Sequence, residues 1–149
     1  MLKLAIFIVT INNGSMASVG KKPKKIGKLK QNGVRLEPHE KRTILFLRSL
    51  GYDIELIPPR NSPGSKTPDM MMLGLPWEMK CPQGKSMKSI DNMFLKALKQ
   101  SNNILIDLRE TKGDEATAIK MLKKRYEKAR PCKNLRIITK DNKELVFRR

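Results

Sequence analysis

Hydrophobic residues recur at the spacing of helices and strands from Leu36 to the end of the chain. Apolar side chains three and four positions apart indicate an amphipathic helix, and apolar–polar alternation indicates a half-buried strand. The pattern predicts helices from Pro38 to the residue before Gly51, over residues 86–101, and over residues 114–129. It predicts single strands and hairpins at 53–57, 69–73, 77–80, 103–108, 135–139 and 144–147. The order α-β-β-β-α-β-α-β-β indicates an α/β (α+β) fold, a mixed β-sheet flanked by helices.

Residues 1–35 lack this pattern and predict a basic N-terminal arm. Residues 21–30 read KKPKKIGKLK, and no acidic residue occurs before Glu37. Such charge blocks are usually disordered. Two interpretations stay open: a solvated linker to a preceding segment, or an arm that grips nucleic-acid phosphates through Lys21, Lys22, Lys24 and Lys25. The chain thus divides into a disordered arm, 1–35, and a folded domain, 36–149.

Residues 2–11 (LKLAIFIVTI) are apolar but too short to span a bilayer. A secretion signal is disfavoured, because the hydrophobic run is short and the cleavage site after it is poor. Met16 opens a second plausible start, so residues 1–15 need not belong to the native protein. We expect no membrane span and a cytoplasmic location.

Composition and charge narrow the function. The 149 residues suit one domain, and 32 Lys and Arg against 14 Asp and Glu give a net charge of +18, which favours a polyanionic partner. Aromatic residues are only 5% of the chain, which disfavours a base-stacking platform. The single histidine, His39, excludes catalysis by paired imidazoles, and two cysteines are too few for a zinc finger or zinc ribbon. A nucleic-acid-binding protein is the class that remains.

Residues 67–81, TPDMMMLGLPWEMKC, carry the candidate chemistry. A hairpin turning at Gly74 would place Asp69 beside Glu78, and strand alternation would put Lys80 on the same face as Glu78. Two adjacent carboxylates repel each other unless a cation lies between them, and Mg²⁺ prefers such oxygen ligands. Lys80 would then act on the attacking water, which predicts a phosphodiester-hydrolysing site. The alternative is structural: Asp69 shapes a turn, and Glu78 and Lys80 form a surface ion pair.

Pro68 with Asp69, and Glu78 with Met79 and Lys80, match the two halves of the motif of the PD-(D/E)XK nuclease superfamily. The longer string TPDMMMLGLPWEMKCPQGKS, followed by IDNMFLKALKQSNNILIDLR, resembles the tRNA-cleaving C-terminal toxin domains of bacterial contact-dependent growth inhibition (CdiA-type) proteins. Met70 replaces the usual aromatic residue of that group, and Cys81 replaces a common serine. The resemblance implies a restriction-endonuclease-like sheet and cleavage of tRNA in a target-cell cytoplasm. It also implies Mg²⁺ or another divalent ion such as Mn²⁺ or Zn²⁺, and a cognate immunity protein.

Further site residues follow from the same resemblance. The superfamily carries an acid on its first helix, and Glu40 lies on the core-facing stripe there, while Glu37, one turn earlier, remains open. Glu40 would complete the catalytic and metal-binding set of Asp69, Glu78 and Lys80. Gln100 matches a helix glutamine of the toxin group and would touch substrate phosphate. Lys85 and Lys88 would grip backbone phosphates, although a solvated surface explains them almost equally well.

Three functions remain. The first is a metal-dependent endonuclease acting on tRNA. The second keeps the same site but cleaves DNA, as restriction and repair nucleases of the superfamily do. The third is a basic nucleic-acid-binding protein without catalysis, which an intact pair of acids followed by a lysine argues against.

Overall fold

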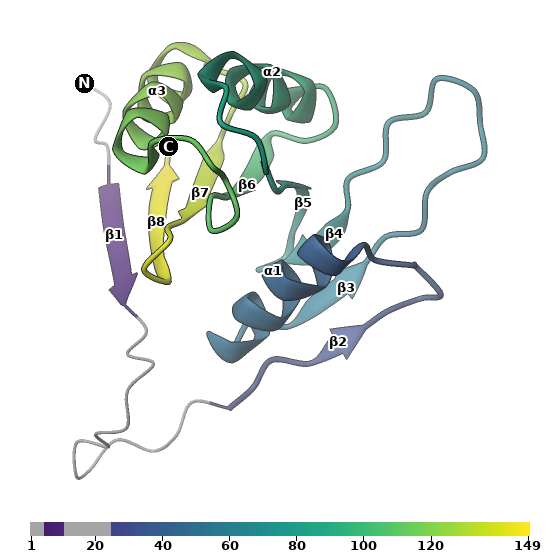
Figure 1. The fold of residues 1–149 in the computed structure, drawn as a ribbon. Helices are drawn as coiled ribbons and strands as arrows, with labels where there is room; N and C mark the ends of the chain where they lie inside the picture. Colours follow the sequence, from purple (N-terminus) through teal and green to yellow (C-terminus); the bar gives the residue numbers. More distant parts are fainter. Residues whose placement is uncertain (1–4, 11–24) are drawn as a thin grey trace, which may run out of the picture.

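In the computed structural model, the described part of the chain, residues 5–10 and 25–149, forms one mixed sheet of eight strands with three helices (Figure 1). The strand order across the sheet is β1-β8-β7-β6-β5-β4-β3-β2. The elements in chain order are β1 (Ala5–Thr10), β2 (Leu29–Lys30), α1 (Pro38–Ser49), β3 (Ile54–Leu56), β4 (Met70–Met72), β5 (Leu75–Lys80), α2 (Met87–Leu98), β6 (Asn103–Asp107), α3 (Glu115–Lys128), β7 (Asn134–Ile138) and β8 (Lys143–Arg148). From α1 onward the predicted order and the mixed α/β class are confirmed.

The sheet is parallel at its centre and antiparallel at most other pairings. β5, β6 and β7 run parallel, which requires the crossover helices α2 and α3, and the β3–β4–β5 and β7–β8 pairs are antiparallel. α2 and α3 cover one face of this parallel centre, and α1 packs on the opposite face (Figure 1). Because successive side chains of a strand point to opposite faces of the sheet, β6 contributes residues to two different cores.

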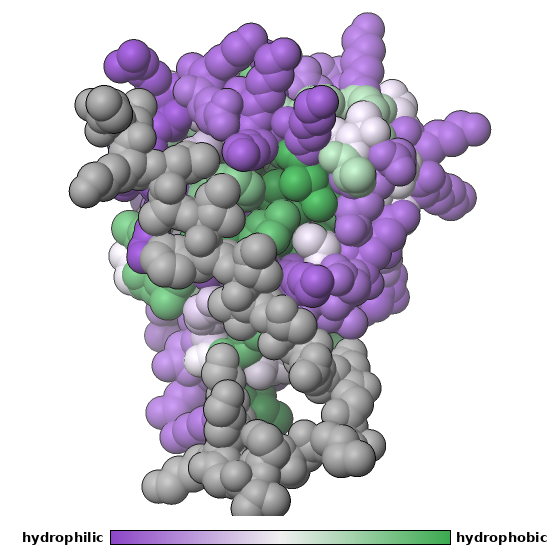
Figure 2. Space-filling model, turned by 90° about the vertical axis from the view of Figure 1, so that its left-hand side faces the viewer, coloured by the Kyte–Doolittle hydropathy of each residue, from purple (hydrophilic) through white to green (hydrophobic). Residues whose placement is uncertain are grey.

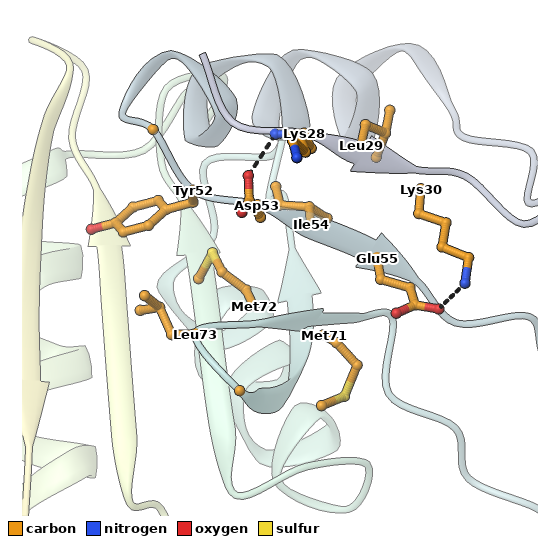
Figure 3. A pocket seen from close by; sticks show the side chains of 12 residues that line it. Lys28, Leu29, Lys30, Tyr52, Asp53, Ile54, Glu55, Met71, Met72 and Leu73 are labelled. Atoms are coloured by element: carbon orange, nitrogen blue, oxygen red, sulfur yellow. Dashed lines mark hydrogen bonds and ion pairs between the residues drawn. The ribbon is translucent and has the colours of Figure 1, made fainter. Parts of the chain in front are cut away.

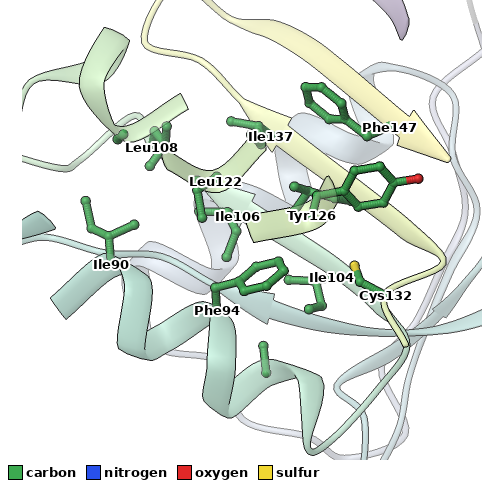
Figure 4. Close-up of a cluster of buried hydrophobic side chains, with 13 residues drawn as sticks. Ile90, Phe94, Ile104, Ile106, Leu108, Leu122, Tyr126, Cys132, Ile137 and Phe147 are labelled. Carbon is green, nitrogen blue, oxygen red and sulfur yellow. The ribbon is translucent and has the colours of Figure 1, made fainter. Parts of the chain in front are cut away.

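The two cores show this division. Under α2 and α3 lies a core that includes Phe94, Ile104 and Ile106 (Figure 4). Under α1 lies the other, with Leu47, Trp77 and Leu105 among its members. Burying a large apolar side chain contributes about 1.5–3 kcal/mol, so both faces of the central sheet stabilise the fold. The site described below lies where β5 passes between the two cores.

Two parts of the segment predicted as a disordered arm, residues 5–10 and 25–35, have defined positions in the structure. β1 pairs with β8, and β2 pairs with β3 at the opposite edge of the sheet. Before β2, the Gly27 N–H donates to the Arg48 carbonyl at 2.8 Å, and the Arg48 Nε donates to the Gly27 carbonyl at 2.8 Å. A Cβ on Gly27 would lie 1.7 Å from the Tyr52 carbonyl oxygen, so only glycine fits this approach.

The prediction of a disordered arm rested on the charges of the side chains, and these charges do not determine whether the backbone pairs with a neighbouring strand. The side chains of Lys28 and Lys30 are directed to solvent or to an exposed partner, while their backbone groups bond to the β3 segment. Residues 5–10 and 29–30 therefore belong to the sheet, and backbone hydrogen bonds of Gly27 and Lys28 attach the chain before β2 to the same part of the fold. Lys21, Lys22 and Lys24 lie outside the described residues. No helix in the described part of the chain is long and apolar enough to cross a membrane.

Candidate functional site

The β4–β5 hairpin places Asp69 beside Glu78, as the sequence predicts. Leu73 and Gly74 form the turn, with φ values of 56° and 73°, and Met70 pairs with Trp77. Two central residues with positive φ match the right-handed twist of the paired strands. The Asp69 N–H donates to the Trp77 carbonyl at 2.9 Å. Asp69 therefore lies directly before β4, at the position opposite Glu78 of β5.

Glu78 and Lys80 lie on one face of β5, and their side chains meet. Glu78 Oε1 lies 3.0 Å from Lys80 Nζ and accepts a longer hydrogen bond, 3.4 Å, from Gln100 Nε2. The Glu78 side chain is only 3% exposed, and Lys80 is 26% exposed. Trp77 and Met79 point to the other face, into the core under α1. A surface ion pair between Glu78 and Lys80 is therefore the wrong description, because the carboxylate is buried.

One oxygen of this buried carboxylate lacks a partner. Glu78 Oε2 is fully buried and has no hydrogen-bond partner among the described residues. By contrast, Asp69 Oδ2 accepts the Met79 N–H at 2.8 Å, which orients the Asp69 side chain along the strand. A buried carboxylate oxygen without a donor is costly, on the order of 1–3 kcal/mol or more for a charged group. The arrangement leaves Glu78 Oε2 available to a ligand with positive charge.

The two carboxyl groups perturb each other. Burial and, after it, the Asp69 charge together raise the pKa of Glu78 to about 7, against the opposing effect of Lys80. Burial also raises the pKa of Asp69, against the Met79 N–H and the Lys80 charge, which lower it. A cation between the two oxygens would remove both penalties, and two carboxylates suit a hard divalent ion. The donor set at Asp69 and Glu78 therefore fits such an ion.

Glu40 faces the same region but is partly engaged elsewhere. Its Oε2 accepts the Glu37 N–H at 2.7 Å in a capping box that begins α1. Glu40 and Asp69 line a common cavity of about 190 Å³, and the Glu40 charge raises the pKa of Asp69. Glu37 itself is exposed. Of the two acids left open by the sequence, Glu40 is the one directed to the site.

The three acids do not form a closed ligand shell. Within the residues that the structure describes, no three His, Cys, Asp or Glu side chains gather closely enough to hold a metal ion. Asp69, Glu78, Lys80 and Gln100 come together, whereas Glu40 shares a cavity lining with Asp69 and with none of the other three. The role of Glu40 as a third ligand stays a prediction.

Of the described residues predicted to bind phosphate, one contacts the site directly and the others lie on the surface. Gln100, two residues beyond α2, contacts Glu78 and so belongs to the site itself. Lys85, before α2, and Lys88, in its first turn, are exposed. Lys25 is exposed at the start of the stretch that leads to β2. The contacts of these three lysines with nucleic acid stay predictions.

A buried polar cluster beside the site was not predicted. Asp107, 4% exposed at the end of β6, accepts hydrogen bonds from Thr43 Oγ1 at 2.5 Å and from Arg109 Nε and NH2. Thr43 lies one turn after Glu40 on α1 and also contacts Cys81 Sγ at 3.3 Å. The cluster ties α1 to β6 and so fixes where Glu40 stands. The only sequence signal was one acid within an otherwise apolar strand, which is ambiguous alone.

A larger cavity lies elsewhere. About 700 Å³ opens at the β2–β3–β4 edge, between residues such as Lys30, Glu55 and Met71 (Figure 3). Both of its acids are engaged: Lys30 Nζ lies 3.3 Å from Glu55, and the Asp53 carboxylate accepts the backbone N–H of Lys28 at 2.7 Å. Neither Asp69 nor Glu78 lines it. This cavity therefore carries none of the chemistry that the sequence predicts.

Comparison with known proteins gives two matches. Residues 66–143, slightly more than half of the chain, match the family model described as the contact-dependent growth inhibition CdiA C-terminal domain. This span contains Asp69, Glu78, Lys80 and Gln100, and Glu40 lies before it. A solved structure, the CdiA-CT/CdiI toxin and immunity complex from Burkholderia pseudomallei, holds a chain with a similar fold. Its TM-score is 0.61 at 17% identity, over 81% of this chain and 99% of that one. No curated protein matches the sequence.

Proposed function

Since this chain belongs to the family of contact-dependent growth inhibition CdiA C-terminal domains, we propose that it is a toxin domain that works as a metal-dependent endonuclease. We propose tRNA as its substrate. The observation that carries the proposal is the buried Glu78 next to the half-buried Asp69 and Lys80, with no hydrogen-bond partner for Glu78 Oε2 among the described residues. A protein that only binds nucleic acid gains nothing from burying two acids that repel each other.

Each residue of the site has a separate task. Asp69 Oδ and Glu78 Oε2 would hold a divalent ion, Mg²⁺ by preference or Mn²⁺ or Zn²⁺, with Glu40 in reach of the same cavity. When bound, such an ion neutralises charge on the scissile phosphate. Lys80 Nζ, partly exposed, donates to the attacking water or to a phosphate oxygen. Gln100 and the Met79 N–H keep the two carboxylates oriented.

The preference for RNA follows from what one small domain can recognise. The described chain is one sheet with three helices, and none of it forms a second domain for reading a DNA sequence in the major groove. A folded tRNA presents a distinctive shape with exposed single-stranded loops and ends. The resemblance of the residues around Trp77 and Arg109 to tRNA-cleaving toxins supports the same substrate.

We also propose a protein partner and a place of action. The structural neighbour is described as a toxin and immunity complex, so this domain would be neutralised by a cognate immunity protein. With a net charge of +18, the domain favours an acidic inhibitor. As a delivered toxin domain it would act in the target-cell cytoplasm, where tRNA is found.

The test is incubation of the purified protein with total tRNA and with plasmid DNA, each with Mg²⁺ or EDTA. We expect a discrete cut in tRNA that needs the ion. Asp69→Ala, Glu78→Ala and Lys80→Ala should each abolish cleavage but leave tRNA affinity largely intact. Lys140→Ala, an exposed lysine at the β7–β8 turn, is the matched control and should cleave normally.

Other outcomes separate the alternatives. Full activity in Asp69→Ala would show that the chemistry lies elsewhere. Linearised plasmid with intact tRNA in the same tube would support the DNA endonuclease. Tight binding of both nucleic acids without any cleavage in Mg²⁺, Mn²⁺ or Zn²⁺ would support the non-catalytic binder.

A further inference from the structure

The outer surfaces of α2 and α3 carry a dense set of lysines. On α3, Lys120, Lys124 and Lys128 are exposed at positions i, i+4 and i+8, which places them on one side of the helix. On and directly after α2, Lys88, Lys96 and Lys99 are exposed. Figure 2 shows hydrophilic side chains projecting along the upper edge of the molecule, at the height of α2 and α3 in Figure 1.

These lysines lack acidic partners. Over the described residues, the ion pairs made by α2 and α3 are limited to one, between Arg125 and Asp91. Residues 1–36 contain no acid that could neutralise the surface from the N-terminal side. Like charges at i and i+4 on a helix repel each other and destabilise it. The α3 lysines therefore repel each other in the free protein, and a bound polyanion would remove that repulsion.

The two helices enclose a groove beside the lysines. A cavity of about 280 Å³ is lined by Asp91, Met121, Lys124, Arg125 and Lys128. Asp91 accepts two hydrogen bonds from Arg125, at 2.6 and 2.7 Å, which hold the guanidinium across the groove. Because this pair is internally neutral, the net charge at the groove comes from Lys124 and Lys128. The groove is therefore shaped and charged for an anionic ligand.

Its chemistry favours a nucleic acid over a protein or a membrane. Protein interfaces are built around apolar and aromatic groups and are depleted in lysine. Of the large hydrophobic side chains on α2 and α3, only Leu95 is strongly exposed, at 37%. Membrane-surface helices need a continuous apolar face to enter the headgroup layer. Regularly spaced lysines beside a single strongly exposed hydrophobic side chain suit a phosphate backbone.

The groove is also connected to the candidate active site through α2. Asp91, in the middle of α2, lines the groove, and Gln100, just beyond the end of α2, contacts Glu78. Lys96 and Lys99 stand exposed at that same end of the helix. A strand of phosphates that follows α2 from the groove would therefore arrive at Lys80 and the two carboxylates.

We propose that the lysine-lined groove between α2 and α3 is the docking surface for the phosphate backbone of the RNA substrate. This inference rests on the proposed nuclease function, which supplies the RNA. It places the substrate across both helices, with the body of the RNA on α3 and the scissile phosphate at the end of α2.

The experiment compares two triple variants of the full chain that lose the same charge. The groove variant carries Lys120→Gln, Lys124→Gln and Lys128→Gln. The control variant carries Lys28→Gln, Lys41→Gln and Lys140→Gln, three exposed lysines on other elements. Affinity for unmodified tRNA is measured in EDTA over a range of salt, so that no cleavage occurs. Cleavage kinetics are then measured with Mg²⁺, and thermal unfolding checks that both variants fold.

We expect the groove variant to bind tRNA at least about 10-fold more weakly, with the salt slope reduced by about 3, since each phosphate contact contributes about 1. Its KM should rise while kcat at saturating tRNA stays near wild type. The control variant should change much less.

Equal losses in both variants would overturn the docking surface, because they would show that only net charge matters. Unchanged tRNA affinity with lost binding to phosphatidylglycerol vesicles would overturn it in favour of a membrane. If the wild type cleaves no RNA, the proposed function fails. The EDTA titrations would still report whether the groove binds RNA.

Discussion

Replacing Glu78 by glutamine should stabilise the protein at alkaline pH, although it removes a residue of the proposed active site. The side chain is 3% exposed, and its Oε2 has no hydrogen-bond partner in the part of the chain that the structure describes. The folded state therefore holds a carboxylate whose pKa is raised to about 7 from 4.5 by burial, with the Asp69 charge adding to the rise. Glutamine keeps the shape and can still accept from Gln100, but it carries no charge.

The sign and size follow from proton linkage. A carboxyl whose pKa is higher in the folded than in the unfolded state binds more protons when folded, so stability falls as pH rises from 4.5 to about 7. The penalty is complete above that window. At about 1.4 kcal/mol for each pH unit, the full difference would be about 3.5 kcal/mol, and partial access of solvent to the site reduces it to about 3 kcal/mol. Glu78→Gln should therefore gain up to about 3 kcal/mol at pH 8 and lose most of that gain at pH 5.

The assay is urea unfolding in EDTA at pH 5 and pH 8. Glu127→Gln, which removes an exposed acid on α3, is the control and should change stability little at either pH. Adding Mg²⁺ at pH 8 should stabilise the wild type and have a smaller effect on Glu78→Gln. If Glu78→Gln is no more stable than the wild type at pH 8, the buried Glu78 carboxylate does not destabilise the folded protein. The argument for a cation site would then fail.

Other parts of the structure make further predictions. Gly27→Ala should destabilise the protein by about 1–3 kcal/mol in urea, because the new Cβ would meet the Tyr52 carbonyl oxygen at 1.7 Å. Glu144→Leu should cost about 3–5 kcal/mol, since it leaves the buried Arg136 guanidinium without its carboxylate partner. Changing the lysines at 21, 22, 24 and 25 to glutamine should reduce the salt slope of tRNA binding without changing thermal stability.

Each of these has its own check. Gly84→Ala is the control for Gly27, because nothing lies within 4 Å of its Cβ position. An unaffected Gly27→Ala protein would mean that residues 25–30 do not pack on the fold. A stable Glu144→Leu variant would show that Arg136 escapes to water. An unchanged salt slope after the lysine changes would leave the N-terminal segment as a linker.

Local pattern was enough for much of the candidate site. Strand alternation placed Glu78 and Lys80 on one face and Trp77 and Met79 on the other, because the side-chain period of a strand is two wherever the strand lies. The two-residue turn at Gly74 fixed the register that sets Asp69 opposite Glu78. These relations span a dozen residues, so the covalent chain itself carries them.

Long-range pairing could be decided only by the tertiary structure. Gln100 and Glu78 are 22 residues apart, Asp107 and Thr43 are 64 apart, and Tyr52 donates to Glu144 across 92 residues at 2.8 Å. The sequence of a strand that ends in a carboxylate does not show whether that carboxylate contacts a hydroxyl, a guanidinium or water.

The basic stretch before β2 shows the same limit. Its composition indicates a solvated arm, yet the edge of β3 offers unpaired backbone groups that residues 28–30 satisfy. Local periodicity sets which face a side chain takes. The packing of distant elements sets what that side chain meets, because burial and hydrogen-bond partners exist only once those elements are in place.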